Sequence, residues 1–471
     1  MSKFANRYIG DRSFYKRILF IAVPMMIQTG ITNFVSLLDN IMVGRVGTDQ
    51  MSGVAIANQL MFVFNIAIFG AISGAGIFGA QFFGKGNHEG VRYAFRFKLI
   101  VCGIFSILAL GIFIIFREPL LSAFISSDSQ VGDPAATLFY GKQYLAVMLV
   151  GLIPFAIKEA YAGTLKETGE AIVPMVAGII AVLVNLMFNT ILIFGYLGAP
   201  KLGVVGAAIA TVLSRFVELG IVAWWTHKHT ERNQFIVGAL RSLHIPKRLM
   251  GQMIIKGMPL TLNETLWACG TSIMVQCYSM RGLQVVAGYN ISSTVSNLFN
   301  VAFISLGAAI GILIGQLLGA GKMEEAVEQD RKMIAFAVFA CSIIGIVMAI
   351  IAPLFPQIYK TEAAVQELAR NLLFVSAAAM PVYAFTNGSY FTIRSGGKTF
   401  VTFLFDSFFV WTISVPLAYL LSRYTDLPII PLYIICQMTE VVKGVIAYIL
   451  LRKKVWVNNI VTGMEQKEPV E

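Results

Sequence analysis

Long runs of apolar residues fill most of the chain, and short segments rich in charged residues, Gly and Pro separate them. A helix needs about 20 consecutive apolar residues to cross the hydrocarbon core of a bilayer. Because the runs reach this length, the pattern predicts membrane-spanning helices joined by short loops. The twelve predicted spans cover residues 18–43, 53–83, 97–116, 138–157, 171–194, 203–225, 255–279, 285–318, 332–355, 368–391, 400–421 and 428–451.

The composition excludes a soluble protein. Of the 471 residues, 57% are hydrophobic and only 13% are charged, which is too few charged residues to cover a soluble chain of this size. The net charge of +11 would suggest a nucleic-acid partner in a soluble protein. In a membrane protein, an excess of Lys and Arg in the cytoplasmic segments accounts for it, so we expect no nucleic-acid partner.

The positions of Lys and Arg predict the orientation. With the N-terminus inside, the cytoplasmic segments hold 26 of the 36 Lys and Arg residues and the outer loops hold 8. Basic residues gather on the cytoplasmic side of bacterial membrane proteins. We therefore expect a multi-pass membrane protein with both termini in the cytoplasm. The polar, basic start of the chain is interpreted as a cytoplasmic arm and not as a cleaved signal peptide.

The two halves of the chain are similar to each other. Residues 24–96 align with residues 259–331 without a gap, and 14 of the 73 aligned pairs are identical, where chance gives about four to six. Further along, Glu218 aligns with Glu440. The halves are therefore related by duplication.

Six spans in each half give both halves the same orientation, related by an axis along the membrane normal. We expect an all-α membrane protein with twelve transmembrane helices in two pseudo-symmetric six-helix lobes around a central cleft. The N-terminal lobe covers 1–225, a solvated basic cytoplasmic linker covers 226–254, and the C-terminal lobe with a short tail covers 255–471. Two lobes that rock against each other give alternating access, so the duplication favours a transporter.

Asp39 is the first candidate for function, because an ionised group inside a span costs about 2.5–3.5 kcal/mol on insertion scales. It continues a polar row with Gln28, Thr32 and Ser36 that is expected to face the lobe interior. An acid held there could exchange a proton or coordinate a sodium ion. The alternative is an acid with only a local structural partner.

Asn185 and Asn189 lie one turn apart in the fifth predicted span. Their amides could act as ligands or donate hydrogen bonds to a carboxylate on a neighbouring helix. The alternative is that they only hold helices together.

Glu264 begins a helical row with Trp267, Thr271 and Tyr278 in the seventh span. An acid beside aromatic rings can receive a lipophilic cation, whereas the alternative is a buried structural pair. Most aromatic residues in spans serve packing, so we predict a substrate cleft from a set and not from any one member. The set is Glu264, Trp267, Tyr278, Asn300, Tyr383 and Asn387.

Three further acids lie in predicted spans. Glu218 is three residues from Arg215, and Glu440 is three residues from Lys443, so these two favour structural ion pairs. Asp406 has no evident partner in the sequence, and its role stays open.

Motifs for enzymatic chemistry are incomplete. Residues 79–86, GAQFFGKG, place Gly86 where a phosphate-binding loop requires a hydroxyl, and SGGKT at 395–399 lacks the first glycine of that loop. The four histidines fall in predicted inner loops and form no zinc or Ser/His/Asp pattern. We expect no enzyme and no cofactor.

Several stretches together resemble the multidrug and toxic compound extrusion (MATE) family of the MOP flippase superfamily, over nearly the whole chain. They are residues 24–47, 79–87, 163–174, 188–211 and 259–270. The resemblance implies twelve helices in two lobes and export driven by inward flow of H⁺ or Na⁺, with Asp39 as the ion-linked acid. It also implies that Asn185, Asn189 and Thr211 belong to the cation site of the first lobe.

The chain departs from the sodium-driven members similar to the Vibrio type. Those members carry an acid in the tenth helix about eleven residues before the arginine of an LRG-like turn, and counting back from Arg394 reaches Tyr383. A cation site in the second lobe is therefore less supported. The pattern is closer to members common in Gram-positive bacteria, and the coupling ion, H⁺ or Na⁺, stays open.

The expected function is secondary active efflux of amphipathic, often cationic, organic compounds, by a chain that holds both halves and is expected to act as a monomer. The alternative is a flippase for a lipid-linked oligosaccharide or cell-wall precursor. A flippase should place several basic residues in the cleft, and only Arg215 and Lys443 lie in predicted spans, both near acids. A channel or sensor is a third hypothesis, which the duplicated acids and the lack of a gating-charge helix disfavour.

Overall fold

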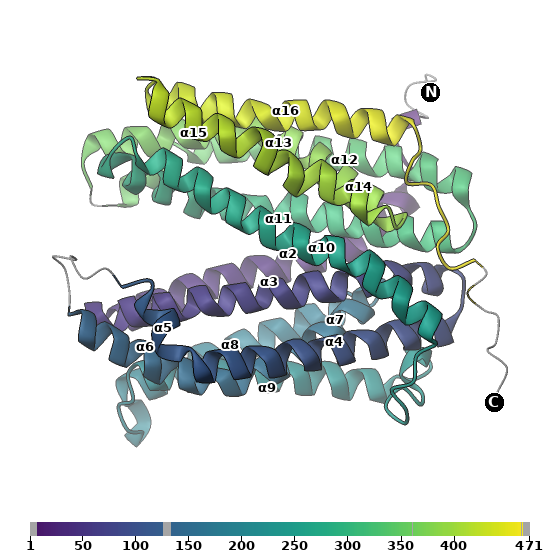
Figure 1. Ribbon diagram of the computed structural model, residues 1–471, viewed down its shortest axis with the longest axis horizontal. Coiled ribbons are helices and arrows are strands. Elements are labelled where there is room, and N and C mark those ends of the chain that lie inside the picture. Colours follow the sequence, from purple (N-terminus) through teal and green to yellow (C-terminus); the bar gives the residue numbers. More distant parts are fainter. Residues whose placement is uncertain (1–6, 126–132, 360, 463, 465–471) are drawn as a thin grey trace. The chain divides into compact units, whose positions relative to one another are not determined.

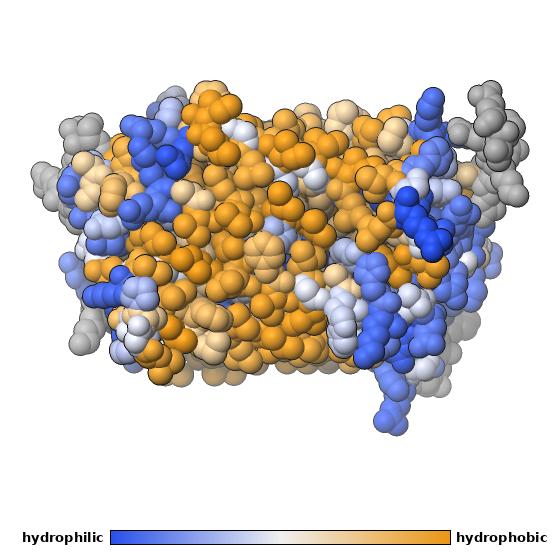
Figure 2. Space-filling view, turned by 90° about the horizontal axis from the view of Figure 1, so that it is seen from below, coloured by the Kyte–Doolittle hydropathy of each residue, from blue (hydrophilic) through white to orange (hydrophobic). Residues whose placement is uncertain are grey.

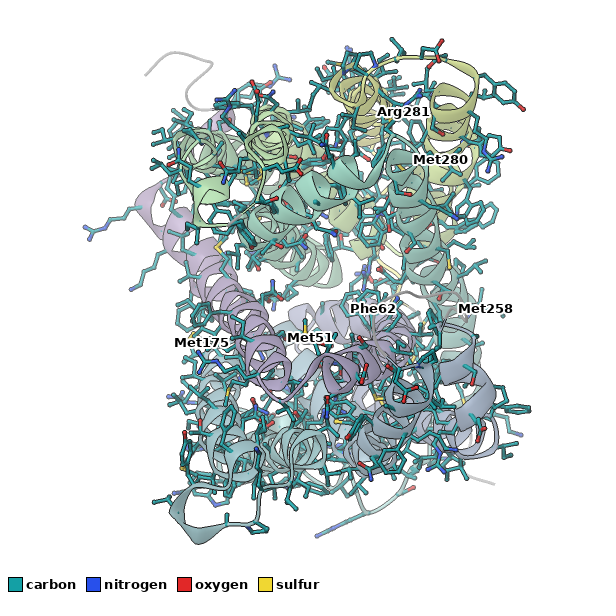
Figure 3. The ribbon with its side chains drawn as sticks, turned by 90° about the vertical axis from the view of Figure 1, so that its left-hand side faces the viewer. Met51, Phe62, Met175, Met258, Met280 and Arg281 are labelled. Atoms are coloured by element: carbon teal, nitrogen blue, oxygen red, sulfur yellow. The ribbon has the colours of Figure 1, made fainter. Side chains whose placement is uncertain are left out.

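The computed structural model describes residues 7–125, 133–359, 361–462 and 464, and all regular elements in these ranges are helices (Figure 1). Within the described ranges, eleven helical segments are long and apolar enough to cross a membrane. Apolar side chains cover the middle of the face shown in Figure 2, and hydrophilic ones gather toward its ends. Large apolar side chains such as Phe62 and Met258 (Figure 3) are 48% and 64% exposed. The chain is a multi-pass membrane protein.

Each of the twelve predicted spans falls on helical structure, although several helices are longer than predicted. The helix at the predicted span 97–116 begins at His88, and that at 332–355 begins at Met323. The predicted seventh span falls in α10 (Lys247–Ser279), which is not among the eleven segments. Its middle carries the polar residues Asn263 and Glu264, which lower its hydropathy. The crossing of α10 stays a prediction, as does the arrangement in two six-helix lobes.

One compact unit, here unit 2, consists of Ile27–Gly79 and His88–Gly251. Within it, α8 packs along α9 and α4 packs along α7. Its helices are the later part of α2 (Arg12–Gly44), most of α3 (Thr48–Gly84), α4 (His88–Ile115), α5 (Arg117–Ser122), α6 (Pro134–Met148), η1 (Leu149–Gly151), α7 (Leu152–Glu167), α8 (Ile172–Phe194), η2 (Tyr196–Gly198), α9 (Val204–Lys228), η3 (Gln234–Ile236) and the first turn of α10.

The segment that follows α9 packs against α4, so the prediction of a solvated linker is wrong for this part. Phe235 of η3 is 1% exposed, and its ring centroid lies 5.5 Å from that of Phe95. The Arg96 guanidinium donates to three carbonyl oxygens of residues 238–244, each at 2.9 Å. A count of basic residues could not reveal that a buried cation and an apolar ring hold this segment.

The other compact unit, unit 1, consists of Met1–Met26, Ala80–Asn87 and Gln252–Glu471. Here α13 packs against α11, α12 and α16. Its helices are the start of α2, the end of α3, most of α10, α11 (Leu283–Gly319), α12 (Met323–Ile351), η4 (Phe355–Ile358), α13 (Ala363–Ser395), α14 (Thr399–Phe403), η5 (Leu404–Phe408), η6 (Val410–Ser414), α15 (Val415–Tyr424) and α16 (Ile429–Arg452). The predicted lobe division at 225 and 255 stays a prediction.

Within unit 1, the last turn of α3 crosses the end of α11 at two glycines that occupy equivalent positions of the repeat. A Cβ on Gly84 would lie 1.9 Å from the carbonyl oxygen of Gln316, and a Cβ on Gly319 would lie 1.9 Å from that of Gln81. Only glycine permits two backbones to approach this closely.

The segment after α16 also packs within unit 1. Trp456 is 1% exposed, and its carbonyl oxygen would lie 1.7 Å from a Cβ on Gly396. The amide of Gln81 donates to the Asn458 carbonyl oxygen at 3.2 Å and accepts from the Ile460 N–H at 2.9 Å. This segment is therefore part of the fold.

Candidate functional site

The four predicted ion-coupling residues lie in one chain of hydrogen bonds in unit 2. Asp39 of α2 accepts from Asn189 Nδ2 of α8, with 2.6 Å between Oδ1 and Nδ2. Asn189 Nδ2 also donates to Asn185 Oδ1 at 3.0 Å, one turn away on the same face of α8. Asn185 Nδ2 donates in turn to Thr211 Oγ1 of α9 at 3.2 Å. Three helices thus supply the site, and its role in ion coupling stays a prediction.

The site is rich in oxygen atoms. Asn185 is 4% exposed and Asn189 is 1% exposed. Within the described ranges, Asn189 Oδ1 has no hydrogen-bond partner, and no ion pair joins Asp39 to a Lys or Arg. A buried polar atom without a partner is costly. A carboxylate beside such an oxygen can take up a proton or serve as a ligand of a hard cation.

Tyr144 of α6 belongs to the same neighbourhood, although no pattern in the sequence predicts it for this site. Its hydroxyl donates to Asn58 Oδ1 of α3 at 3.2 Å. Arg215, Asp39 and Thr211 lie within interaction range of that hydroxyl. The site therefore draws on five helices, and spacing along one helix could not identify a member from α6.

The polar row of α2 does not face the interior throughout. Gln28 and Asp39 are partly buried, whereas Thr32 and Ser36 are exposed, so the prediction is wrong for these two. Thr32 Oγ1 donates to the Gln28 carbonyl oxygen of its own helix at 2.9 Å. The row covers about 80° of the helix circumference at 100° per residue, which leaves room for one edge to be exposed.

A second network lies in unit 1 around Glu264. The Tyr390 hydroxyl of α13 donates to Glu264 Oε1 of α10 at 2.9 Å. Asn263 Nδ2 donates to the Tyr390 hydroxyl oxygen at 3.2 Å and to Asp406 Oδ2 at 3.0 Å. Glu264 is therefore linked to the acid for which the sequence showed no partner.

The main partner of Asp406 comes from α16. Lys443 Nζ lies 2.5 Å from Asp406 Oδ1 and 3.6 Å from Glu440 Oε1. The short separation from Glu440 agrees with the predicted pair. The pair with Asp406 joins segments 37 residues apart, which no local spacing reveals.

The predicted pair of Glu218 with Arg215 is replaced by another. Glu218 Oε1 lies 3.5 Å from Lys158 Nζ of α7. Arg215 Nη1 donates instead to the Gly151 carbonyl oxygen at 3.1 Å. A partner on a neighbouring helix thus takes the place of the one on the same helix.

The other residues predicted for the substrate cleft have different surroundings. Trp267 is 42% exposed. Tyr278 is 3% exposed and packs edge-on against Tyr433, with ring centroids 5.5 Å apart. Tyr278 lies about 21 Å along α10 from Glu264 at 1.5 Å per residue. The predicted row of residues on α10 therefore includes both the polar network around Glu264 and the packed core around Tyr278. A place for Tyr278 in the cleft is therefore corrected to a place in the packed core.

The remaining three lie in α11 and α13. The Tyr383 ring stacks on that of Phe303 at 5.6 Å, and its hydroxyl donates to Gln437. Asn300 is partly buried. Asn387 Oδ1 is buried without a hydrogen-bond partner in the described part of the chain. Their role in substrate binding stays a prediction.

A multi-pass helical chain with internal duplication and acids buried in its helices is typical of secondary transporters. The MatE family model matches residues 24–191 and 259–420, one segment in each half. This match covers most of the chain, and the protein belongs to the MatE family of transporters.

The chain is 24% identical over 460 residues to a probable multidrug resistance protein NorM of Thermotoga maritima, which covers 97% of this chain and 94% of that protein. It is 23% identical over 427 residues to the probable multidrug resistance protein YoeA of Bacillus subtilis, covering 90% of each.

Solved structures share the fold. A crystal structure of MATE in the bent conformation gives a TM-score of 0.83 at 18% identity, covering 97% of this chain and 98% of that one. An outward-facing multidrug resistance MATE transporter of the MOP superfamily gives 0.80 at 20% identity over 97% and 98%.

Proposed function

We propose that the protein is a secondary active exporter that exchanges H⁺ or Na⁺ for amphipathic, often cationic, organic compounds. Membership of a transporter family supports transport, and relatives that are named multidrug resistance proteins support this class of substrate. The observation that carries the proposal is the contact of Asp39 with Asn189 at 2.6 Å, beside an amide oxygen for which the described residues offer no partner.

The proposal includes the arrangement that alternating access requires. Twelve spans form two six-helix lobes around a central cleft, in the bacterial cytoplasmic membrane, with both termini in the cytoplasm. The chain acts as a monomer, because it carries both repeats. Substrate enters the cleft from the cytoplasm or the inner leaflet and leaves outside.

Coupling follows from what a cation changes at Asp39. Asp39, Asn185, Asn189 and Thr211 hold the cation, whose charge offsets that of the carboxylate. A bound proton instead removes the charge of Asp39 and gives one of its two carboxyl oxygens an O–H donor. Either event alters the hydrogen bond between α2 and α8, so the two conformations of the N-terminal half differ in affinity for the cation. The cation then shifts the population toward release of substrate.

The membrane potential supplies enough energy for one cation per cycle. One charge that moves inward across 100 mV yields about 2.3 kcal/mol. That energy sustains a roughly 50-fold gradient of an uncharged substrate at one-to-one exchange.

Efflux of ethidium from proteoliposomes under an imposed Na⁺ or H⁺ gradient tests the proposal. The variant Asp39→Asn should lose gradient-driven efflux, and the gradient that drives the native protein identifies the ion. Asp426→Asn is the matched control, because Asp426 is exposed. Unchanged efflux in Asp39→Asn would remove this acid from the mechanism.

Charge pairing disfavours the alternative of a flippase for a pyrophosphate-linked lipid. Such a substrate needs cations that are free to bind phosphate. Lys443 lies 2.5 Å from Asp406, and Lys158 lies 3.5 Å from Glu218. These lysines are therefore already bound to acids of the protein.

A further inference from the structure

Both units hold a lysine ammonium next to a partly buried acid at the same position of the repeat. In unit 2, Lys158 Nζ donates to Glu159 of its own helix, and it lies 3.5 Å from Glu218 and 5.0 Å from the centre of the Phe155 ring. In unit 1, Lys443 Nζ lies 3.6 Å from Glu440 and 5.4 Å from the centre of the Phe405 ring. Glu218 and Glu440 are repeat-equivalent.

The two lysines themselves are not equivalent. Gly169 and Gly397 both have left-handed φ angles, +90° and +73°, in the turns that follow α7 and α13. Counting back eleven residues from each glycine reaches Lys158 in α7 and Thr386 in α13. Thr386 Oγ1 donates to Glu440 Oε2 at 3.3 Å, so it occupies the place at Glu440 that Lys158 occupies at Glu218.

The acid that binds Lys443 has a glycine as its counterpart. Counting nine residues forward from the same two glycines reaches Gly178 and Asp406. A Cβ on Gly178 would lie 3.4 Å from Gln28 Nε2 and 3.6 Å from Glu218 Oε1. In unit 1, Asn263 corresponds to Gln28 and Glu440 corresponds to Glu218. Asp406 lies between these two residues, since it contacts Asn263 at 3.0 Å and binds Lys443, which lies beside Glu440. One half therefore uses α7 and the other uses α16 to bring an ammonium to the same place.

We propose that each ammonium is a tethered cation in a site for a small monovalent cation, formed in unit 1 by Asp406, Glu440 and Thr386 and in unit 2 around Glu218. Two different helices deliver the same charge to equivalent positions. The requirement is therefore for a cation at the site, and not for a particular helix contact.

The ammonium has the features of a bound ion. The side chains of Lys443, Asp406 and Glu440 are 7%, 13% and 19% exposed. Their surroundings contain two carboxylates and one hydroxyl, which are the oxygen ligands that hard cations prefer. Removing one partner of a buried pair leaves an uncompensated charge. A variant without the ammonium should therefore recruit a free cation from solution.

The lysine-filled cation sites have a consequence for ion coupling, and this consequence rests on the proposed function, whereas the existence of the sites does not. Because Lys158 and Lys443 permanently fill these sites, Glu218, Asp406 and Glu440 are not available to the coupling ion. Asp39, for which the described ranges contain no ion pair with Lys or Arg, keeps this capacity in the N-terminal half.

Sodium binding to Lys443→Met in an Asp39→Asn background tests the proposal, since this background removes the proposed coupling acid. The purified full-length protein is measured in detergent by ²²Na⁺ binding and by its thermal unfolding midpoint. NaCl is compared with choline chloride at constant ionic strength. We expect one additional sodium ion per chain and a Tm that rises by several degrees with NaCl. The same protein with Lys443 intact should show neither change.

Two controls separate a cation site from a general loss of charge. Lys142→Met breaks the pair with Glu118, which measures 2.6 Å against 2.5 Å for Lys443 and Asp406. Because the Glu118 side chain is 61% exposed, this variant should create no sodium dependence. Adding Asp406→Asn to Lys443→Met should abolish the new sodium binding. Sodium binding that survives Asp406→Asn, or its absence from Lys443→Met, would overturn the proposal.

A second variant covers the case in which Lys443→Met does not fold. Lys443→Ala leaves room for ethylammonium, which replaces the lost group with the same charge. We expect ethylammonium chloride to restore folded protein and raise the Tm, and neutral propionamide at the same concentration to have no such effect. Equal rescue by both compounds would show that only volume is needed, which contradicts the proposal. This result is independent of export, because the assay contains no transported substrate.

Discussion

Asn189 uses only half of its amide at Asp39. Its nitrogen lies 2.6 Å from Asp39 Oδ1, whereas no described residue donates a hydrogen bond to its oxygen. The side chain is 1% exposed. A buried amide in this state can offer its oxygen to a cation that Asp39 attracts.

Asn189→Ala should weaken the binding of Na⁺ at Asp39 more than it weakens folding, because it removes an oxygen ligand. A contact to a charged group contributes about 1.5–3 kcal/mol, so the Na⁺ concentration for half-maximal efflux should rise roughly 10- to 100-fold. Thr190→Ala is the matched control, because Thr190 is the next residue and its hydroxyl donates within its own helix at 2.8 Å. An equal change in both variants would exclude a specific role for Asn189.

Glu264→Gln should reduce export of cationic compounds more than export of neutral ones, because it removes a charge and keeps the shape of the side chain. Tyr390→Phe should have a smaller effect in the same direction, since the Tyr390 hydroxyl donates to Glu264 at 2.9 Å. Efflux of ethidium is compared with that of an uncharged dye in the same vesicles. A similar loss for both dyes would contradict an electrostatic role for Glu264.

Lys98→Met should destabilise unit 2 strongly. Lys98 is fully buried, and its Nζ lies 2.6 Å from Glu167 Oε2 and 3.0 Å from Thr164 Oγ1. Removing one partner of a buried pair costs about 3–5 kcal/mol, whereas an exposed pair contributes at most about 1 kcal/mol. Thermal unfolding of Lys98→Met and of the exposed-pair variant Lys142→Met compares the two. Adding Glu167→Gln to Lys98→Met should recover part of the loss, and no recovery would contradict the pairing.

Gly84→Ala should be destabilising because its Cβ would meet backbone and not a movable side chain. The nearest atom, the Gln316 carbonyl oxygen, would lie at 1.9 Å. Relieving such an overlap costs typically about 1–3 kcal/mol. Gly103→Ala in α4 is the control, since nothing lies within 4 Å of its Cβ, and alanine is favoured over glycine in a helix by about 1 kcal/mol. The unfolding midpoints should therefore move in opposite directions.

Asp11 predicts a local pH dependence at the start of α2. The Phe14 N–H, at 2.9 Å, and the Ser13 hydroxyl, at 2.8 Å, hold the pKa of Asp11 below the 3.8 usual for this side chain. Since the folded pKa is lowered, the stabilisation is present above the unfolded value and is lost as the pH falls through the folded value. Carboxyl-carbon NMR of labelled protein in nanodiscs should give a midpoint under 3.8. A midpoint above that value would contradict the contact.

Much of the fold could be predicted because hydrophobic runs long enough to cross a bilayer are a strong signal. The same holds for Asp39, since an acid in a span is rare and costly. The pairing of Asn185 with Asn189 could also be predicted, because a spacing of four residues places both side chains on one face of a helix. These predictions depend only on properties of a single segment.

The remaining features depend on which helices become neighbours. The partners Lys158 for Glu218 and Lys443 for Asp406 lie on other helices, and nothing in local spacing selects them. For Tyr278, local spacing suggested a neighbour that it does not have. The helical row on α10 predicted that Tyr278 shares the surroundings of Glu264, but Tyr278 lies farther along the helix, in the packed core.

The anchoring of the segment after α16 bears on how the protein should be handled. Trp456 lies against the backbone of Gly396, and Ile460 is tied to the side chain of Gln81. A truncation that begins at Trp456 would remove these contacts with the ends of α3 and α13. Purification tags should therefore be attached beyond Thr462, where they leave the anchored stretch intact.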